Sequence, residues 1–336
     1  MKNVTLGSTG ITVVQNCFGA LPIQRRDKET AVKILRKAYE GGFRFFDTAR
    51  AYTDSEEKLG EAFSIYDRDS YILTSKTMSR DTEGFWKDLE TSLRNLRTDH
   101  IDIYQFHEVH QCYRPNDGTG MYEAMEEAKR QGKIRHIGIT THLLPVAEEI
   151  IESGLYETLQ YPMSYLSSDR EIDLIRKCKD HSMGFIAMTS LAGGLLTKTR
   201  ACMGFASQFD NLVPIWGIQK EEELEQWLSY MNEDVELDDE LRAFIEKEKA
   251  ELSGDFCRAC GYCMPCPAGI EINNCARMSQ LIRRAPSAQF LTEEWQAKME
   301  KITECLHCYH CASRCPYQLD TPKLLEKKLE DYRLII

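Results

Sequence analysis

The sequence has no run of about 18 consecutive apolar residues, the length that a membrane-spanning helix requires. It begins MKNVTLGSTG, without the apolar segment of a secretory signal peptide. We therefore expect a cytoplasmic protein that makes no membrane contact. Disulfides are not expected either, because cytosolic thiols stay reduced.

Basic residues are fewer than acidic ones. The chain has 42 Lys and Arg residues against 53 Asp and Glu residues, which gives a formal net charge of −11. Nucleic-acid-binding domains usually present a basic surface. The composition therefore argues against a nucleic-acid partner.

Cysteine is abundant, and eight of the 13 cysteines form two runs near the C-terminus. The second run reads C-x2-C-x2-C-x3-C-P, the spacing of bacterial iron–sulfur ferredoxins, and the first is one residue shorter. In such runs the proline-flanked cysteine usually ligates the other cluster. We therefore predict two [4Fe–4S] clusters, one held by Cys257, Cys260, Cys263 and Cys315, the other by Cys305, Cys308, Cys311 and Cys266.

Structural zinc is the main alternative, since paired CxxC motifs also build four-cysteine zinc sites. Zinc sites rarely use three evenly spaced cysteine steps followed by proline, so iron–sulfur clusters are favoured. The five scattered cysteines are expected to be small buried hydrophobic residues.

Upstream of these runs, short apolar segments alternate with amphipathic ones. The apolar segments predict strands at 13–20, 43–49, 70–76, 100–107, 133–140, 158–162, 184–190 and 212–217. The amphipathic segments predict helices at 29–42, 55–64, 83–96, 120–132, 144–154, 171–181 and 221–231. This alternation is typical of a parallel sheet covered by helices.

Eight strands in about 245 residues predict an α/β fold, a (β/α)8 TIM barrel. No GxGxxG motif opens a helix after a strand, so an open Rossmann-type sheet would lack its phosphate loop. We place the barrel at residues 1–245 and an α-helical, ferredoxin-like two-cluster domain at 250–336. Helices are expected at 273–285 and 292–304, and an acidic helix at 233–252 is expected to join the domains.

Polar residues at the carboxyl ends of barrel strands are the first catalytic candidates. Asp47, Lys76 and His107 end predicted strands, and Tyr52 follows Asp47 in a loop. An ammonium group beside Tyr52 would lower the pKa of its phenol, and Asp47 would orient that ammonium. Each residue alone also has a structural explanation, but the four together suit protonation of a carbonyl oxygen while hydride reaches its carbon.

These segments resemble the aldo-keto reductase superfamily over most of residues 1–230. GGFRFFDTARAYTDSEEKLGEAF resembles the family's motif around its Asp and Tyr, LTSK supplies its Lys and IDIYQFH its His. The resemblance implies that Asp47, Tyr52, Lys76 and His107 form the catalytic tetrad, with Tyr52 as the proton donor. Together with the cysteine runs, it extends to a subgroup of iron–sulfur aldo-keto reductases.

The resemblance also implies NAD(P)H, bound across the barrel mouth. KIRHIGITTH resembles the segment that holds the nicotinamide carboxamide, and LQYP contains the corresponding Gln, Gln160. SLAGGLL resembles the pyrophosphate loop. The implied nucleotide contacts are Thr140, Thr141, Gln160, Met188, Leu191, Gly193, Gly217 and Lys220.

Several positions depart from the family pattern. Thr140 and Thr141 stand where Ser-Asn is usual, and Met188 replaces a Tyr that stacks on nicotinamide. The position of the family's Arg that binds the 2′-phosphate of NADPH falls near Glu223. Both NADH and NADPH therefore remain possible cofactors. Glu108 stands where Trp is frequent, which predicts a less apolar substrate pocket.

The main hypothesis is therefore an oxidoreductase that reduces a carbonyl, or oxidises an alcohol, and is coupled to or supported by its clusters. Hydride transfer moves two electrons and a cluster moves one, and no flavin motif is present to connect them. The alternative is a redox-partner or redox-sensing protein whose barrel binds nucleotide while the clusters exchange electrons with a ferredoxin or flavoprotein.

Overall fold

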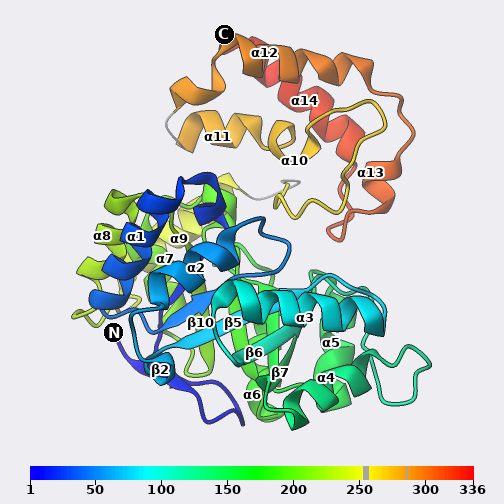
Figure 1. The fold of residues 1–336 in the computed structure, drawn as a ribbon. Helices are drawn as coiled ribbons and strands as arrows, with labels where there is room; N and C mark the ends of the chain where they lie inside the picture. Colours follow the sequence, from blue (N-terminus) through cyan, green and yellow to red (C-terminus); the bar gives the residue numbers. More distant parts are fainter. Residues whose placement is uncertain (253–256, 285–286) are drawn as a thin grey trace. The chain divides into compact units, whose positions relative to one another are not determined.

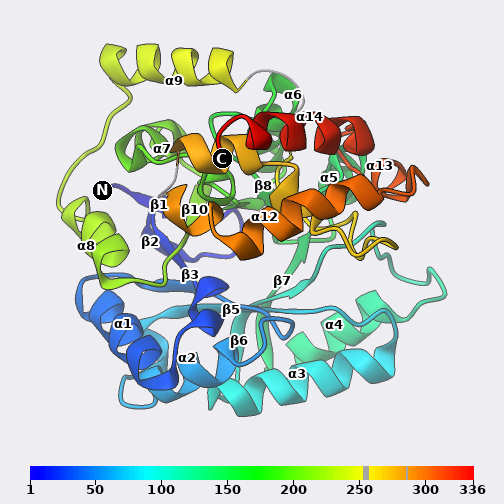
Figure 2. The ribbon, with the colours of Figure 1, turned by 90° about the horizontal axis from the view of Figure 1, so that it is seen from above.

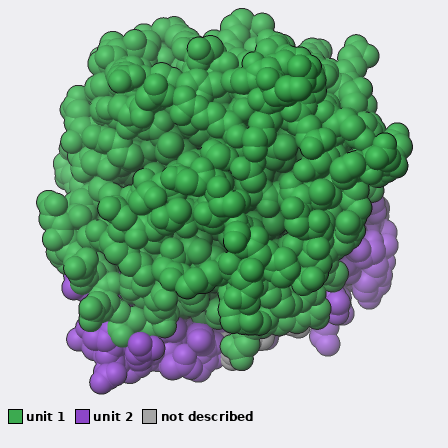
Figure 3. All heavy atoms as spheres, turned by 90° about the horizontal axis from the view of Figure 1, so that it is seen from below, with its two compact units in different colours: residues 1–190, 203–237 green, residues 191–202, 238–336 purple. Residues whose placement is uncertain are grey.

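A computed structural model describes residues 1–252, 257–284 and 287–336. The chain forms two compact units, which are coloured separately in Figure 3. We call residues 1–190 and 203–237 the barrel unit, and residues 191–202 and 238–336 the cluster unit. The domain ranges predicted from the sequence stay a prediction; the units divide the chain between residues 237 and 238 and assign one barrel-region loop to the cluster unit.

The barrel unit contains a closed barrel of eight parallel strands, so the predicted fold class is confirmed (Figure 1). Around the barrel the strands follow the order β10-β3-β4-β5-β6-β7-β8-β9. Their bounds are β3 (Cys17–Gly19), β4 (Phe45–Asp47), β5 (Ile72–Thr77), β6 (Ile101–Phe106), β7 (Ile134–Thr140), β8 (Thr158–Pro162), β9 (Gly184–Met188) and β10 (Leu212–Gly217). Every residue of β6 and β8 is buried, as expected for strands covered on both faces.

Amphipathic helices follow the strands and surround the barrel (Figures 1 and 2). They are α1 (Lys28–Glu40), α2 (Ser55–Phe63), α3 (Thr82–Leu96), α4 (Met121–Arg130), α5 (Leu144–Ser153), α6 (Asp169–Asp180), α7 (Thr199–Ala206) and α8 (Glu221–Ser229), with single 3-10 turns η1 (Pro22–Arg25) and η2 (Arg68–Ser70). The seven helices predicted in this region are present, whereas α7 was not predicted. No helix in the described ranges is long and apolar enough to span a bilayer.

The predicted strand 13–20 is wrong as one element. Its first part belongs to β2 (Thr12–Val14), which pairs antiparallel with β1 (Asn3–Thr5). The side-chain amide of Gln15 donates to the carbonyls of Ala206, Phe209 and Leu212 at 2.8–2.9 Å, and this fixes the break before β3.

The hairpin closes one end of the barrel. Its apolar side chains pack with residues of five barrel strands in one cluster, which contains Val4, Leu6, Ile11, Val13, Cys17, Phe45, Ile103, Ile186, Val213 and Ile215. Because this cluster fills the amino-terminal end, the carboxyl ends of the strands remain for a functional site.

The cluster unit is built from short helices around its own apolar core. Its elements are η3 (Ala192–Gly194), α9 (Asp239–Glu251), α10 (Ile272–Cys275), α11 (Met278–Arg284), η4 (Ser287–Phe290), α12 (Glu293–Glu300), η5 (Lys301–Glu304), α13 (His310–Ser313) and α14 (Thr321–Arg333). Helix α14 was not predicted, yet its residues Leu324, Leu325, Leu329 and Tyr332 form the centre of this core. Helices α10, α11 and α12 all contact α14.

Three predicted helices differ in their bounds. The acidic helix expected at 233–252 begins only at Asp239, because the side chain of Asp238 accepts the amide of Leu241 and caps it there. The helix expected at 273–285 is divided into α10 and α11, and its last residue lies outside the described residues. The helix expected at 292–304 is α12 continued by a 3-10 turn.

Candidate active site and cluster sites

Three of the four catalytic candidates lie at the carboxyl end of the barrel. Asp47 is the last residue of β4, Lys76 lies near the end of β5, and His107 follows β6. Parallel pairing brings these strand ends together: Asp47 is opposite Thr74, and Lys76 is opposite Gln105. The strands therefore deliver a carboxylate, an ammonium and an imidazole to the same rim.

Asp47 and Lys76 form a buried ion pair. Lys76 Nζ lies 2.7 Å from each carboxylate oxygen of Asp47 and donates to the carbonyl of Thr48, also at 2.7 Å. Thr74 Oγ1 donates to Asp47 Oδ1 at 2.6 Å. Lys76 is fully buried and Asp47 is 3% exposed, so these hydrogen bonds replace the water that both charges lose on folding.

Tyr52 is carried by the loop between β4 and α2 and is partly buried. Its ring centroid lies 5.4 Å from Lys76 Nζ and 5.7 Å from the ring centroid of His107, which it meets edge to face. The loop is anchored at its end by Ser55, whose hydroxyl donates to the carbonyl of Ala20 at 2.8 Å. The structure thus brings the four candidate side chains together.

The expected effect on Tyr52 is wrong in direction. Burial raises the pKa of the Tyr52 phenol well above its usual value, and the charges of Asp47 and Glu108 raise it further. The Lys76 ammonium, which both carboxylate oxygens of Asp47 bind, does not outweigh these effects. Tyr52 therefore keeps its proton at neutral pH.

His107 is 7% exposed and uncharged at neutral pH. Burial lowers its pKa well below the usual value, and the positive charge of Lys76 lowers it further. Its Nδ1 has no hydrogen-bond partner among the described residues. A neutral imidazole of this kind can both donate and accept a hydrogen bond.

Two cavities in the cluster unit are lined by cysteines. The first is bordered by Cys257, Cys260, Cys263 and Cys315. The second is bordered by Cys263, Cys266, Cys305, Cys308 and Cys311. Each cavity thus brings three cysteines of one run to the last cysteine of the other run, as crossed ligation requires, and Cys263 borders both cavities.

The backbone turns sharply at four of the five CxxC steps. One residue in each of these four steps has a positive φ: Ala259 (58°), Gly261 (86°), His307 (46°) and Tyr309 (54°). Such turns direct successive N–H groups into a concavity that suits an anion, including iron–sulfur clusters. Only the glycine among these four could have been suspected from the sequence.

Comparison with known proteins agrees with both units. Residues 17–211 match the model of the aldo/keto reductase family, which covers more than half of the chain. The chain belongs to the aldo/keto reductase family. Residues 256–320 match a 4Fe-4S dicluster domain, so this aldo/keto reductase carries iron–sulfur clusters.

Characterised and uncharacterised relatives are about 30% identical to the chain over the aligned segments. The uncharacterized oxidoreductase YrpG of Bacillus subtilis is 30% identical over 226 residues, which are 58% of this chain and 68% of YrpG. L-galactose dehydrogenase of Arabidopsis thaliana is 30% identical over 212 residues, 57% of this chain and 66% of that protein. NADPH-dependent codeinone reductase 1-1 of Papaver somniferum is 32% identical over 219 residues, 58% of this chain and 68% of that protein. The chain thus spans about two thirds of the length of these relatives.

Solved structures show the same fold at lower identity. The aldo-keto reductase AKR11C1 from Bacillus halodurans superposes with a TM-score of 0.64 at 22% identity, over 74% of this chain and 96% of that one. The thermostable aldo-keto reductase Tm1743 superposes with a TM-score of 0.60 at 23% identity, over 74% of this chain and 99% of that one.

The two threonines expected near the carboxamide are already engaged within the reductase barrel. Thr140 Oγ1 accepts the amide of Glu108 at 2.7 Å. Thr141 Oγ1 donates to the carbonyl of Val109 at 2.8 Å and accepts the amide of Leu143 at 3.1 Å. Both hydroxyls therefore hold the loops that follow β6 and β7.

The remaining nucleotide candidates of the barrel unit follow β8, β9 and β10. Gln160 is buried on β8, where its Oε1 accepts from Gln105 at 2.8 Å, and Met188 ends β9. Gly217 ends β10, and Lys220 precedes α8. Leu191 and Gly193 belong to the cluster unit, where Gly193 has a φ of 66°.

Glu223 has a local role that the sequence did not indicate. Its carboxylate accepts the backbone amides of Gln219 at 2.9 Å and Lys220 at 3.2 Å. This closes the first turn of α8, and a helix N-terminus favours a negative charge there.

Glu108, beside His107, is a further polar group at the rim. It is a non-glycine residue with a φ of 51°, and its carbonyl accepts from Arg80 Nη2 at 3.1 Å. Its side chain is 33% exposed and lies 4.0 Å from Nε2 of the buried His142. Burial raises the pKa of the Glu108 carboxyl. Backbone strain of this kind often marks a functional site.

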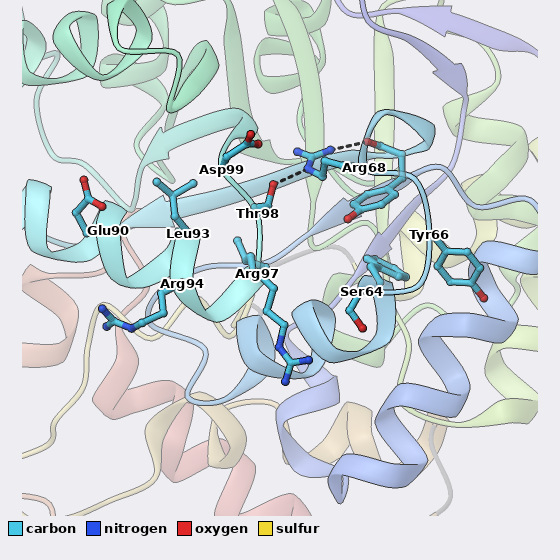
Figure 4. Close-up of a pocket in the computed structure, with 12 residues that line it drawn as sticks. Ser64, Tyr66, Arg68, Glu90, Leu93, Arg94, Arg97, Thr98 and Asp99 are labelled. Carbon is cyan, nitrogen blue, oxygen red and sulfur yellow. Dashed lines mark hydrogen bonds between the residues drawn. The ribbon is translucent and has the colours of Figure 1, made fainter.

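A separate hollow of about 750 Å³ lies before the first residues of β5 and β6 (Figure 4). Its arginines are already bound within the barrel: Arg68 donates to Asp102 at 2.6 Å and to Thr98 at 3.0 Å, and Arg97 donates to Glu61 at 2.6 Å. The amino-terminal side of such barrels mainly serves stability, so we place no catalytic site there.

Proposed function

We propose that the chain is an NAD(P)H-dependent carbonyl reductase in which Tyr52 donates the proton to the carbonyl oxygen. The observation that supports it is the group of Tyr52, neutral His107 and the buried Asp47–Lys76 pair at the carboxyl end of the barrel. When bound, the reduced nicotinamide supplies the hydride for the carbonyl carbon.

In this proposal Tyr52 transfers the proton, and the other residues position the substrate and stabilise charge. Tyr52 is protonated at neutral pH, which suits a general acid and favours the reductive direction. His107 offers a neutral imidazole that can hydrogen-bond the substrate oxygen. Lys76, fixed by Asp47, places a positive charge beside the Tyr52 ring and stabilises the phenolate that forms when the proton leaves.

For the nucleotide we propose contacts from Gln160, Met188, Gly217 and Lys220 in the barrel unit. The hydroxyls of Thr140 and Thr141 would contribute only if their present hydrogen bonds to the loops were shared. The Papaver relative is named as NADPH-dependent. Glu223 places a carboxylate where a 2′-phosphate would need a cation, so we expect NADH to bind at least as well as NADPH.

The substrate is a small carbonyl compound with polar substituents. Glu108 places a partly exposed carboxyl near Tyr52, and the exposed Arg80 holds the backbone of His107 at 2.8 Å. Hydroxyl or ammonium groups on the substrate would find an acceptor at Glu108, whereas a purely apolar substrate would leave it desolvated.

For the clusters we propose crossed ligation. Cys257, Cys260 and Cys263 with Cys315 would hold the first cluster, and Cys305, Cys308 and Cys311 with Cys266 the second. Cluster ligands must be thiolates, and the cavities they border are otherwise lined mainly by apolar residues such as Ile272. When bound, such clusters carry single electrons.

Electron relay is a second candidate function, favoured by the exposure of Cys308. Leu306 and Tyr309 beside it are 65% and 54% exposed. A ferredoxin or flavoprotein would therefore reach the second cluster without rearrangement. If reduced ferredoxin failed to bleach the cluster absorbance under anaerobic conditions, this second function would be removed.

Replacing Tyr52 with Phe tests the main proposal. In assays of NADH and NADPH oxidation with a panel of carbonyl compounds, Tyr52→Phe should lose about 100-fold or more in kcat, since general-acid catalysis is worth that much. Nucleotide binding, followed by fluorescence, should persist. The matched control is Tyr66→Phe, because the Tyr66 hydroxyl only donates to Glu40 at the surface. Equal turnover by Tyr52→Phe and wild type would contradict the proposal.

A further inference from the structure

Arg277 lies between α10 and α11 and binds a distant segment of the cluster unit. Its Nη1 donates to the carbonyls of Ala192 at 3.1 Å and Gly193 at 3.2 Å, and its Nη2 donates to Gly193 at 3.2 Å. The side chain is only 4% exposed. One guanidinium thus fixes the loop Leu191–Gly194.

The loop is shaped around this guanidinium. Gly193 has a φ of 66°, and a Cβ added there would lie 2.3 Å from Arg277 Nη1. Any other residue would meet both the backbone strain and the contact. The close fit shows that the hydrogen bonds are built into the loop.

Arg277 directly follows a residue of the first cluster cavity. Its neighbour Ala276 borders that cavity together with Cys257. Arg277 lies near enough to Cys257 to lower the pKa of its thiol, against the larger effect of burial.

Arg277 also lacks the usual partner of a buried cation. Among the described residues, no carboxylate forms an ion pair with it, and its Nε has no hydrogen-bond partner. A buried charge without a counter-charge is strongly unfavourable. The thiolate-ligated cluster, which is negatively charged overall, would supply that counter-charge.

We infer that Arg277 is a positioning residue that links the charge of the first cluster to the conformation of the loop Leu191–Gly194. One electron from a one-electron reductant makes the cluster one unit more negative, and no bond forms or breaks. The stronger attraction draws the guanidinium from the carbonyls of Ala192 and Gly193, so the loop loosens on reduction. By linkage, whatever holds the loop in place makes the cluster harder to reduce.

This inference does not depend on carbonyl reduction or nucleotide binding. Amide hydrogen exchange of the full chain, purified anaerobically with its clusters, tests it directly. We expect the amides of Gly194 and Leu196, which now donate to the Leu191 carbonyl at 2.9 and 3.1 Å, to exchange at least about fivefold faster after dithionite reduction. Exchange rates that are equal in both redox states would overturn it.

Variants separate charge from hydrogen bonding. In Arg277→Gln, one of the two cluster potentials measured by electron paramagnetic resonance should fall by about 59 mV or more, a tenfold change in a one-electron equilibrium. Arg277→Lys should retain that potential, because it keeps the charge. Gly193→Ala should abolish the redox dependence of exchange and, by the same linkage, raise that potential rather than lower it.

Iron analysis is the control for cluster loading. If Arg277→Gln binds no cluster, the exchange rates of wild type, Arg277→Lys and Gly193→Ala in the two redox states still test the inference. Unchanged potentials in a fully loaded Arg277→Gln would overturn the inference.

Discussion

The ammonium of Lys76 is surrounded by three oxygen atoms, two from Asp47 and one from Thr48, each at 2.7 Å. Tyr52 and His107 lie close to this pair, and within the described ranges neither side chain forms an ion pair. Burial therefore keeps both neutral, the phenol protonated and the imidazole uncharged. At the scale of single residues, the hydrogen bonds of one ion pair decide the charge of the whole active centre.

The positions of Asp47, Lys76 and His107 followed from the sequence, because strand ends are readable from apolar runs. The pKa direction of Tyr52 did not follow. It depends first on the burial of the phenol and then on the charges of Asp47 and Glu108, which only the folded chain places around it.

The buried His142 should make the free energy of unfolding depend on pH. Burial lowers its pKa to about 4, below the 6.5 of the unfolded chain. The unfolded state therefore binds the proton first, and stability falls as pH drops from 6.5 toward 4. Between pH 7 and pH 5 this group should remove about 2 kcal/mol from the free energy of unfolding.

Guanidinium unfolding of wild type and His142→Asn at these two pH values measures this loss. The variant should lose about 2 kcal/mol less, while the control His181→Asn, at an exposed site, should behave as wild type. Equal losses in wild type and His142→Asn would exclude His142 as the source.

Helix α2 is joined to the barrel by a buried carboxylate. Glu56 accepts from Ser75 Oγ on β5 at 2.7 Å and from Arg50 at 2.5 Å, and its side chain is fully buried. Arg50 and Glu56 flank the loop that carries Tyr52. At the scale of elements, this contact sets the position of Tyr52, the proposed proton donor, relative to the strand that carries Lys76.

Replacing Glu56 with Gln should therefore lower stability and activity together. Breaking a buried ion pair is worth about 3 kcal/mol, which corresponds to a fall in Tm of about 6–12 °C. The matched control is Glu57→Gln on the exposed side of the same helix, where a change under about 0.5 kcal/mol is expected. Calorimetry on both anaerobic proteins gives the comparison; a Tm for Glu56→Gln equal to that of the control would contradict it.

Most elements were readable from periodicity, and the exceptions have physical causes. The hairpin strand β2 was merged with β3 because the apolar run continues past Gln15, whose role is set by three distant carbonyls. Helix α14 was not predicted, although its apolar residues recur at helical spacing.

Taken as a whole molecule, the chain combines an aldo/keto reductase barrel with a 4Fe-4S dicluster domain. The cysteine spacing was sufficient to predict two clusters, and the barrel followed from the alternation of elements. The burial and the contacts of Arg277 could not be predicted from the sequence, because an arginine in a short helical stretch has no pattern that marks it as buried. The sequence also could not show the left-handed turns at Ala259, His307 and Tyr309, which ordinary residue types adopt here.

Two double variants test crossed ligation. If it holds, Cys260→Ser with Cys315→Ser damages one cluster, and about four irons per chain remain of about eight. Cys260→Ser with Cys266→Ser damages both clusters and leaves few. Ligation within each run would give the reverse result, and iron and sulfide analysis after anaerobic purification distinguishes the two.

The most direct test of the chemistry is the origin of the hydrogen on the product carbon. The anaerobic chain would reduce a carbonyl substrate with nicotinamide nucleotide deuterated at both C4 positions, and mass spectrometry and NMR would locate the label. Hydride transfer in the barrel predicts deuterium on the former carbonyl carbon and a solvent proton on its oxygen. A solvent hydrogen on that carbon would contradict the proposal and show that single electrons, delivered through the clusters, carry the reduction.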